Sequence, residues 1–231
     1  MLTAEDYLSG HVLLIDKPLH WTSFQVVNKL RWEIRNAYNI KKIKVGHAGT
    51  LDPLATGLLV LCTGKMTKQI DTFQGQIKEY TGTLVLGSTT PSFDLETEIN
   101  ETFSTEHLTE EDIHQATKQF IGEIDQYPPV FSAIKKDGKR LYEYARAGKE
   151  VEIKSRRVTI SEFEITGIDT NNVHFRVVCS KGTYIRSLAN DFGKALNSGS
   201  HLSALRRTKI GDFHVEDALT PDGFIKSLTA K

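Results

Sequence analysis

The stretch "GHAGTLDPLATGLLVLCTG", residues 46–64, joins a glycine-rich loop to a continuous run of apolar residues. A short apolar run that is bounded by glycines is typical of a strand buried inside a sheet. We therefore expect residues 57–64 to form a buried strand, with the preceding loop held by that strand. A loop held by a rigid scaffold can present a side chain for binding or catalysis.

Asp52 is the one acidic side chain in this stretch, and two interpretations compete for it. An aspartate before a proline commonly forms a turn in which its carboxylate accepts hydrogen bonds from nearby backbone N–H groups. Glycines at positions 46, 49 and 57 permit a tight backbone and the close approach of another molecule, which favours a nucleophile. For an aspartate before a proline in general, a turn is a more common explanation than catalysis.

The rest of the chain mixes strands and helices without a regular strand–helix alternation. Strands are expected at residues 11–18, 78–87, 156–165, 173–180 and near 209–215, and helices at 22–40, 66–73, 109–122, 141–148 and 181–196, with a short capped tail from residue 220. Residues 125–140 are expected to form a loop. This order favours an α+β fold with a largely antiparallel sheet and flanking helices. No dinucleotide-binding glycine motif or Walker loop is present, so a nucleotide cofactor has no support.

The composition is that of an ordinary globular protein. The chain has 231 residues, 39% of them hydrophobic and 25% charged, which is enough to bury a real core. The longest apolar run, residues 58–62, is far too short to cross a bilayer, and the N-terminus lacks the pattern of a secretory signal. The two cysteines show no spacing for a metal site or a disulfide framework. We expect a cytoplasmic protein without a membrane contact or a bound metal.

Charge is distributed unevenly, although the formal net charge is zero. Residues 94–125 contain ten acids and one base, so the remainder carries 28 bases against 19 acids, a net of +9. The bases cluster at "KKIK" (41–44), "KKDGKR" (135–140), "KSRR" (154–157) and "RRTK" (206–209). Such clusters can attract a polyanion on one face. Composition alone gives the greater weight to scattered, solvated charge.

Arg186 is a second candidate for a functional side chain. If Thr183 caps the expected helix, Arg186 lies in the first turn, where the helix dipole disfavours a cation. An anionic partner would offset that cost, and both a phosphate and the Asp52 carboxylate are candidates. Such a pair would keep Asp52 ionised in an apolar site. A surface arginine that is bonded to water explains the sequence equally well.

Three ring-bearing residues have two interpretations each. Tyr80 on an expected strand and Tyr184 at an expected helix start are suited to core packing, but each could also stack on a nucleobase. His47 lies beside the "KKIK" cluster and could contact a phosphate or an exposed base. As one of eight histidines, it is more often structural.

Several segments together resemble one family. "KVGHAGTLDPLATGLL" closely resembles the catalytic motif of the tRNA pseudouridine-55 synthases. The other similar segments, in chain order over about residues 11–215, are "LLIDKP" with "TS", "KEYTGTLVLG", "YPPVFSAIKKDGKRLYEYARAG", "CSKGTYIRSLANDFG" and "HLSALRRTKIGDF". Any one of these segments is weak, whereas the ordered combination is highly specific.

The resemblance implies a fold and a set of roles. The fold would be a mixed, largely antiparallel sheet with flanking helices and a central RNA-binding cleft, in a single catalytic domain over residues 1–231 that includes the acidic segment 94–125. The resemblance implies that Asp52 is the nucleophile, that Arg186 forms an ion pair with it and that Tyr80 stacks on the target base. It implies that His47 occupies the space left by the flipped nucleotide. Tyr184 and Leu205 would contact the bound nucleotide, and Lys17 and Pro18 would support the site.

The implied activity is the isomerisation of uridine to pseudouridine at position 55 in the T-loop of tRNA, after the base is flipped out. The partner would be the T-arm stem-loop, with no cofactor, no metal and no obligatory protein partner. Asp52 could attack C6 of the base or C1′ of the ribose, or could assist deprotonation. Two other functions remain open: an RNA-binding folding helper in which Asp52 is only a turn, and a related isomerase that depends on a guide RNA and partner proteins.

The chain departs from the family pattern in two places. Where the family commonly has Thr-Asp-Thr-x-Asp, this chain has "TPSFDLETEI", in which Asp94 is the candidate for the second aspartate of the motif. Longer members continue into a C-terminal PUA-type RNA-binding domain, whereas 16 residues follow residue 215 in this sequence. We therefore expect no separate C-terminal RNA-binding domain.

Overall fold

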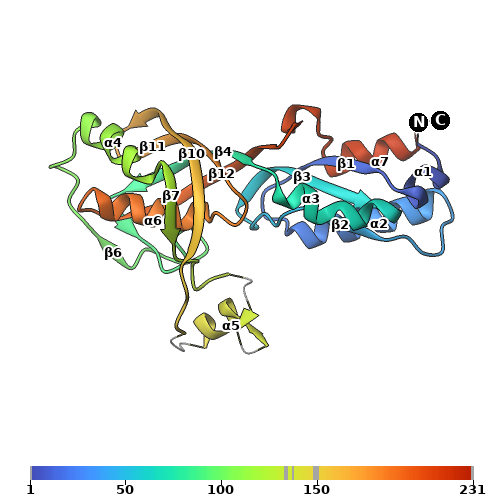
Figure 1. Ribbon diagram of the computed structural model, residues 1–231, viewed down its shortest axis with the longest axis horizontal. Helices are drawn as coiled ribbons and strands as arrows, with labels where there is room; N and C mark the ends of the chain where they lie inside the picture. Colours follow the sequence, from blue (N-terminus) through green and yellow to red (C-terminus); the bar gives the residue numbers. More distant parts are fainter. Residues whose placement is uncertain (1, 133–134, 137, 148–150, 230–231) are drawn as a thin grey trace. The chain divides into compact units, whose positions relative to one another are not determined.

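The computed structural model describes residues 2–132, 135–136, 138–147 and 151–229 (Figure 1). The chain divides into two compact units, one formed by residues 1–80 with 205–231 and the other by residues 81–204. Strands β4 (Lys78–Leu86) and β12 (Ser200–Ile210) each run from one unit into the other. Within the described ranges, no helix is both long enough and apolar enough to span a bilayer.

The sheet of the first unit is built around β3 (Ala55–Thr63), which contains the apolar run. β1 (Val12–Lys17) and β2 (Val45–His47) pair with β3 in antiparallel fashion, whereas the second half of β12 pairs with it in parallel. β13 (Phe213–His214) pairs with the end of β12. Almost every residue of β3 is buried, which confirms the buried strand that was expected at residues 57–64.

Helices cover this sheet. They are α1 (Ala4–Ser9), α2 (Ser23–Ala37), the 3₁₀ helix η1 (Gly64–Gln69), α3 (Ile70–Gly75), the 3₁₀ helix η3 (Val215–Asp217) and α7 (Pro221–Thr229). α2 begins with a capping box between Thr22 and Gln25, in which each side chain bonds the backbone N–H of the other residue. This cap fixes where the helix begins, and therefore where Ser23 lies.

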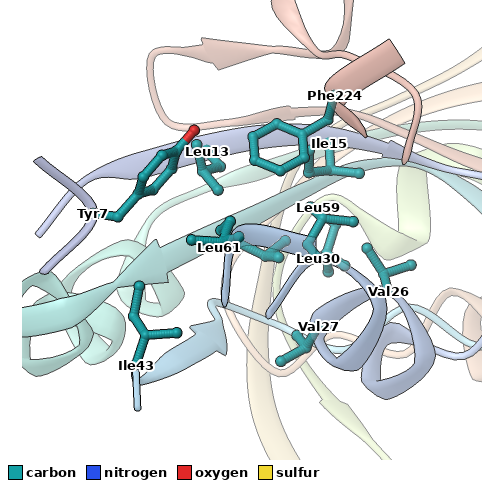
Figure 2. Close-up of a cluster of buried hydrophobic side chains, with 11 residues drawn as sticks. Tyr7, Leu13, Ile15, Val26, Val27, Leu30, Ile43, Leu59, Leu61 and Phe224 are labelled. Atoms are coloured by element: carbon teal, nitrogen blue, oxygen red, sulfur yellow. The ribbon is translucent and has the colours of Figure 1, made fainter. Parts of the chain in front are cut away.

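The two faces of β3 pack against different clusters, because successive side chains of a strand point to opposite faces. Figure 2 shows Leu59 and Leu61 packed with residues of β1, α2 and α7, among them Leu30 and Phe224. On the other face, Leu58 and Val60 pack with a second buried cluster that contains Ala48, Ile210 and Val215. The strand that follows Asp52 is thus fixed from both sides.

The second unit holds the strand order β12–β4–β11–β10–β7, with β11 at Asn172–Cys179, β10 at Arg156–Asp169 and β7 at Gly122–Gln126. Its other elements are the strand pairs β5 (Ser88–Thr89) with β6 (Glu101–Thr102) and β8 (Lys135–Lys136) with β9 (Lys139–Arg140), and the helices α4 (Glu110–Ala116), η2 (Thr117–Phe120), α5 (Leu141–Arg146) and α6 (Ile185–Ala195). A cluster of aromatic rings, which includes Phe163 and Phe192, packs α6 onto this sheet.

The structure confirms the α+β fold with a mostly antiparallel sheet and flanking helices, and it corrects several bounds. β12 begins at Ser200, well before the strand expected near 209–215, because its serine, histidine and arginine residues hide the strand pattern. β7 ends inside the segment that was expected to be a loop from residue 125. The expected helix 109–122 changes from α to 3₁₀ geometry after Ala116. Gly148, the expected end of the helix at 141–148, lies outside the described residues.

Candidate active site

Asp52 lies in the turn that connects β2 to β3. Its backbone carbonyl accepts a hydrogen bond from the N–H of Ala55 at 3.1 Å. A turn was expected here, but as one in which the carboxylate accepts the hydrogen bonds, whereas this bond is accepted by the main chain. The turn is closed by the main chain, and the Asp52 side chain is half-buried. A main-chain turn and a functional carboxylate are therefore compatible at this position.

The first turn of α2 and the segment that precedes it hold the residues on either side of Asp52. The Ser23 hydroxyl accepts a hydrogen bond from the N–H of Leu51 at 2.8 Å and donates one to the Leu51 carbonyl at 3.1 Å. The N–H of His20 donates to the Pro53 carbonyl at 2.8 Å. The backbone that carries Asp52 is thus fixed immediately before and after the carboxylate.

Arg207 on β12 contacts the same loop at its other end. Its side chain is buried, with 1% exposed, and its guanidinium donates to the carbonyls of Leu58 at 2.8 Å, Gly49 at 3.0 Å and Thr50 at 3.4 Å. Gly57 lies opposite Arg207 in the parallel pairing and has a φ of +102°. A Cβ at Gly57 would lie 2.3 Å from the Arg207 carbonyl oxygen, so this close approach of the two strands requires glycine.

Lys17, at the end of β1, is fully buried. Its ammonium donates to the carbonyls of Pro18 at 2.9 Å and Trp21 at 2.6 Å, just before α2. Burial is the main cause that lowers the pKa of Lys17 to about 8, and the Asp52 carboxylate opposes this shift. The lysine therefore fixes the segment that leads into α2, in agreement with the supporting role that the resemblance implied.

Within the described part of the chain, the imidazole ring of His47, on β2, lacks a hydrogen bond at one nitrogen. Its Nδ1 is buried and has no hydrogen-bond partner among the residues that the structure describes. Burial, followed by the positive charge of Arg207, lowers the pKa of His47, while the Gly49 backbone acts in the opposite direction. Burial therefore favours the neutral form of the imidazole.

Tyr80 and Leu205 belong to the same unit as Asp52. Tyr80 lies on β4 and is 8% exposed. Leu205 lies on β12 and is half-buried, and it pairs in register with Ala55, the residue whose N–H closes the Asp52 turn. The pairing of β12 with β3 therefore connects the turn directly to Leu205.

Arg186 lies in the first turn of α6, as the sequence indicated, but Thr183 does not cap this helix. Tyr184 occupies the N-cap position without a side-chain bond, and the Thr183 hydroxyl donates to the Ser180 carbonyl at 2.9 Å instead. Arg186 is buried, so the alternative of a solvated surface arginine is wrong. Its Nε lies 3.6 Å from Oδ2 of Asp94.

Further contacts hold the Arg186 guanidinium. It donates to the carbonyls of Ser92 at 3.3 Å and Phe131 at 3.0 Å. The other carboxylate oxygen of Asp94 accepts from the N–H of Glu96 at 3.0 Å. The loop that departs from the family pattern thus supplies a buried carboxylate for this arginine. The sequence marked Asp94 as a candidate but gave no sign of its pairing with Arg186.

Tyr184 is fixed through its backbone by a residue that the sequence reasoning missed. The Gln126 carboxamide accepts from the N–H of Tyr184 at 2.8 Å and donates to its carbonyl at 3.0 Å. The centre of the Arg156 guanidinium lies 5.3 Å from the centroid of the Tyr184 ring. A glutamine at the end of a short strand carries no motif, so no signal in the sequence pointed to this contact.

The predicted site residues are divided between the two units: His47, Asp52, Tyr80 and Leu205 belong to the first, and Tyr184 and Arg186 to the second. The pairing of Asp52 with Arg186 stays a prediction. Across the described ranges, no group of three or more His, Cys, Asp or Glu side chains is arranged to hold a metal ion.

The "RRTK" cluster, residues 206–209, has one buried cation and two partly exposed ones. Arg207 is buried, and the guanidinium of Arg206 bonds both carboxylate oxygens of Asp16, at 3.0 and 2.7 Å. Lys209 lies 3.7 Å from a carboxylate oxygen of Glu79. Arg206 and Lys209 thus have carboxylate partners within the first unit, and their contact with a polyanion stays a prediction.

The fold and the fixed turn around a single aspartate agree with a class of enzymes, the pseudouridylate synthases. The model of the TruB family of pseudouridylate synthases (N-terminal domain) matches residues 35–185, and the model of the tRNA pseudouridylate synthase B C-terminal domain matches residues 186–229. The chain belongs to the TruB family, which confirms the resemblance seen in the sequence.

Individual relatives are similar over nearly the whole chain. The tRNA pseudouridine synthase B of Flavobacterium johnsoniae is 66% identical over 98% of this chain and 100% of its own length. The protein of the same name from Phocaeicola vulgatus is 57% identical over 95% of this chain and 93% of its own length.

Among solved structures, a chain of a Cbf5–Nop10–Gar1 complex has a TM-score of 0.71 and 30% identity over 97% of this chain and 56% of that chain. A chain of an H/ACA RNP bound to a substrate RNA containing 2′-deoxyuridine has a TM-score of 0.68 and 29% identity over 95% of this chain and 53% of that chain. The present chain therefore spans about half the length of these two solved chains.

Proposed function

We propose that this protein isomerises uridine to pseudouridine at position 55 in the T-loop of tRNA, with Asp52 as the nucleophile. The observation that carries this proposal is the Asp52 turn: a half-buried carboxylate on a backbone that Ser23 fixes at Leu51 and Arg207 fixes at Gly49. The identity of 66% to a tRNA pseudouridine synthase B over nearly the full length supports tRNA as the substrate.

The reaction requires only a rearrangement of bonds. The bond between N1 and C1′ breaks, a bond between C5 and C1′ forms, and the proton on C5 is replaced by one on N1. No atom is oxidised or reduced overall, so the balance requires no cofactor. Because the target uridine is stacked in a folded loop, it must first be flipped out. Attack at C6, attack at C1′ and assistance in deprotonation all begin from an ionised, well-placed Asp52 carboxylate.

Arg186 is proposed to pair with Asp52 and to keep it ionised. The support is that Arg186 is a buried cation whose orientation is fixed by Asp94 and two backbone carbonyls. A guanidinium that is already oriented can meet a second carboxylate with little loss of side-chain entropy. Asp94 is a positioning residue in this scheme.

The remaining roles concern the nucleotide. His47 is proposed to fill the space left by the flipped nucleotide, and its support is the resemblance together with its place on β2, just before the loop that carries Asp52. Tyr80 is proposed to stack on the target base, at roughly 1–3 kcal/mol. Tyr184 and Leu205 are proposed to contact the bound nucleotide. Their support is the resemblance, together with the fixed backbone of Tyr184 and the pairing of Leu205 with the end of the Asp52 turn.

Both units are proposed to act as one catalytic domain, because strands β4 and β12 run through both of them. The acidic segment 94–125 is part of this domain, since Asp94 belongs to the site. The T-arm stem-loop is proposed as a sufficient substrate, without a protein partner, and the cytoplasm as the location. The chains of the solved complexes that work with partners are about twice as long as this chain.

Tritium release tests the proposal. The purified chain is mixed in excess with tRNA, or with an isolated T-arm stem-loop, that carries 5-tritiated uridine. The expected result is release from both RNAs, none from a tRNA with cytidine at position 55, and none with Asp52→Asn, which still binds tRNA. An absence of release from the wild type would contradict the proposal. Full activity of Asp52→Asn in RNA folding would support the folding-helper alternative, and release only with added partner proteins would support a guide-dependent enzyme.

A further inference from the structure

We propose that Arg207 is a positioning residue of the reaction: its buried guanidinium holds the loop that carries Asp52 in one conformation. This inference rests on the proposed function. Arg207 belongs to a basic cluster of the sequence, but its side chain is too deeply buried to bind RNA directly.

The first reason is the electrostatic environment of Arg207. A buried cation is costly unless charged or polar partners compensate for it. Among the described residues, no carboxylate forms an ion pair with Arg207, and its hydrogen-bond acceptors are the carbonyls of Gly49, Thr50 and Leu58. Two of these carbonyls belong to the residues that directly precede Leu51 and Asp52. The loop and the arginine therefore depend on each other.

The second reason is the geometry of the contacts. Nε donates to Leu58, which belongs to β3, whereas the two Nη atoms donate to Thr50 and Gly49 in the loop. Because the guanidinium is planar and rigid, it fixes the distance between the strand and the loop. An ammonium group at the end of a flexible stem carries the same charge but does not fix that distance.

The third reason is that the chain is built to admit this contact. Gly57, which pairs with Arg207, has no Cβ to separate β3 from β12. Ser23 holds Leu51 from the side of α2. The loop is thus fixed at Gly49 and Thr50 by one residue and at Leu51 by another, so that little backbone freedom remains at Asp52. Reactions that require a carboxylate in a defined attack geometry depend on such restriction.

Arg206 provides a matched control within the same motif. It precedes Arg207 on β12, its side chain is 40% exposed, and its guanidinium bonds the Asp16 carboxylate. A change from arginine to lysine at residue 206 alters the same chemical group without touching the Asp52 loop.

The experiment compares wild type, Arg207→Lys and Arg206→Lys in single-turnover tritium release with enzyme in excess over the T-arm stem-loop. The dissociation constant, the melting temperature and the amide hydrogen exchange of residues 49–52 are measured on the same samples. For Arg207→Lys we expect a dissociation constant close to that of wild type, faster exchange at residues 49–52 and a rate lower by about 100-fold, as for a misplaced reacting group. Arg206→Lys is expected to match wild type in rate and in exchange.

A spectroscopic measurement tests whether the charge of Arg207 reaches the ring of His47. Arg207→Gln removes the positive charge that helps to lower the pKa of His47, so the NMR titration of the His47 ring is expected to move to higher pH, and that of Arg206→Gln to stay in place. If Arg207→Lys melts below the assay temperature, the rates of wild type, Arg207→Lys and Arg206→Lys are compared at a lower temperature at which all three are folded.

Three results would overturn the inference: a rate of Arg207→Lys equal to that of Arg206→Lys, a rate loss explained by weaker RNA binding, or unchanged exchange at residues 49–52. An inactive wild type would instead contradict the proposed function, and the amide exchange measurement, which needs no RNA, would still decide whether Arg207 holds the loop.

Discussion

The Nε atom of Arg186 lies 3.6 Å from Oδ2 of Asp94, and both side chains are buried. Removal of one partner from a buried pair leaves the other charge uncompensated, which typically costs about 3–5 kcal/mol. We expect Asp94→Asn to lower the free energy of unfolding by about 3 kcal/mol in urea titrations, and to lower turnover because Arg186 loses its orientation. The exposed neighbour Glu98→Gln is the control. Equal urea midpoints for the two variants would contradict the structural role of the pair.

Gly57 is expected to tolerate no side chain. In Gly57→Ala, the new Cβ would meet the Arg207 carbonyl oxygen at 2.3 Å on a backbone with a φ of +102°. Strained conformations of this kind cost about 1–3 kcal/mol each, and the contact adds to that cost. Thermal unfolding should show a clear loss of stability, together with slower tritium release. Gly75→Ala, whose Cβ would meet nothing within 4 Å, should melt close to wild type; a similar loss in both variants would count against the close strand approach.

Ser23→Ala tests the other side of the loop. It removes the hydroxyl that bonds both the N–H and the carbonyl of Leu51, and an unpaired buried polar group costs about 1–3 kcal/mol. We expect the single-turnover rate to fall while tRNA binding is kept, because the loop before Asp52 gains freedom. The exposed Ser9→Ala serves as the control. A rate for Ser23→Ala equal to that of the control would show that this contact does not position Asp52.

The lowered pKa of Lys17 predicts that the free energy of unfolding depends on pH. Burial lowers its pKa from 10.5 to about 8, so between these values the unfolded chain binds more protons than the folded one. The free energy of unfolding therefore contains a contribution that rises with pH across this window, by at most about 1.4 kcal/mol per pH unit, and that is constant below it.

The measurement is the difference in unfolding free energy between wild type and Lys17→Met from pH 6 to 10. This difference should be flat up to about pH 7.5 and then rise in favour of the wild type. Burial raises the pKa of Cys62 to about 11 and that of Tyr7 to about 12, which lowers stability at high pH, but these effects cancel in the difference. Parallel curves over the whole range would contradict the burial of a charged Lys17.

Local patterns in the sequence were sufficient where short-range physics decides the structure. The run after Asp52 became the buried strand β3, and the apolar residues of the helix at 181–196 became the buried face of α6. A turn at Asp52 also followed from residue types, although the hydrogen bond between residues 52 and 55 is accepted by the main-chain carbonyl. In each case the deciding interactions lie within a few residues, or on one face of one element.

The unpredicted features depend on contacts between distant segments. Most of β12 was not recognised as a strand because it contains charged residues such as Arg207. The partners of this buried arginine are main-chain carbonyls, which every residue has, so the sequence does not reveal them. Residues 206 and 207 are both arginines, yet Arg206 bonds Asp16 and Arg207 bonds the loop that carries Asp52. Asp94 and Arg186 are far apart in the chain, so their pairing follows from the fold and not from either motif alone.

The grip of Arg207 on the loop uses main-chain oxygens alone, and the Thr50 side chain points to an exposed position. The side chain of residue 50 can therefore be substituted without removing the hydrogen bonds between Arg207 and the loop. A cysteine introduced there would carry a fluorescent label two residues from the carboxylate, and its emission would follow RNA arrival in real time.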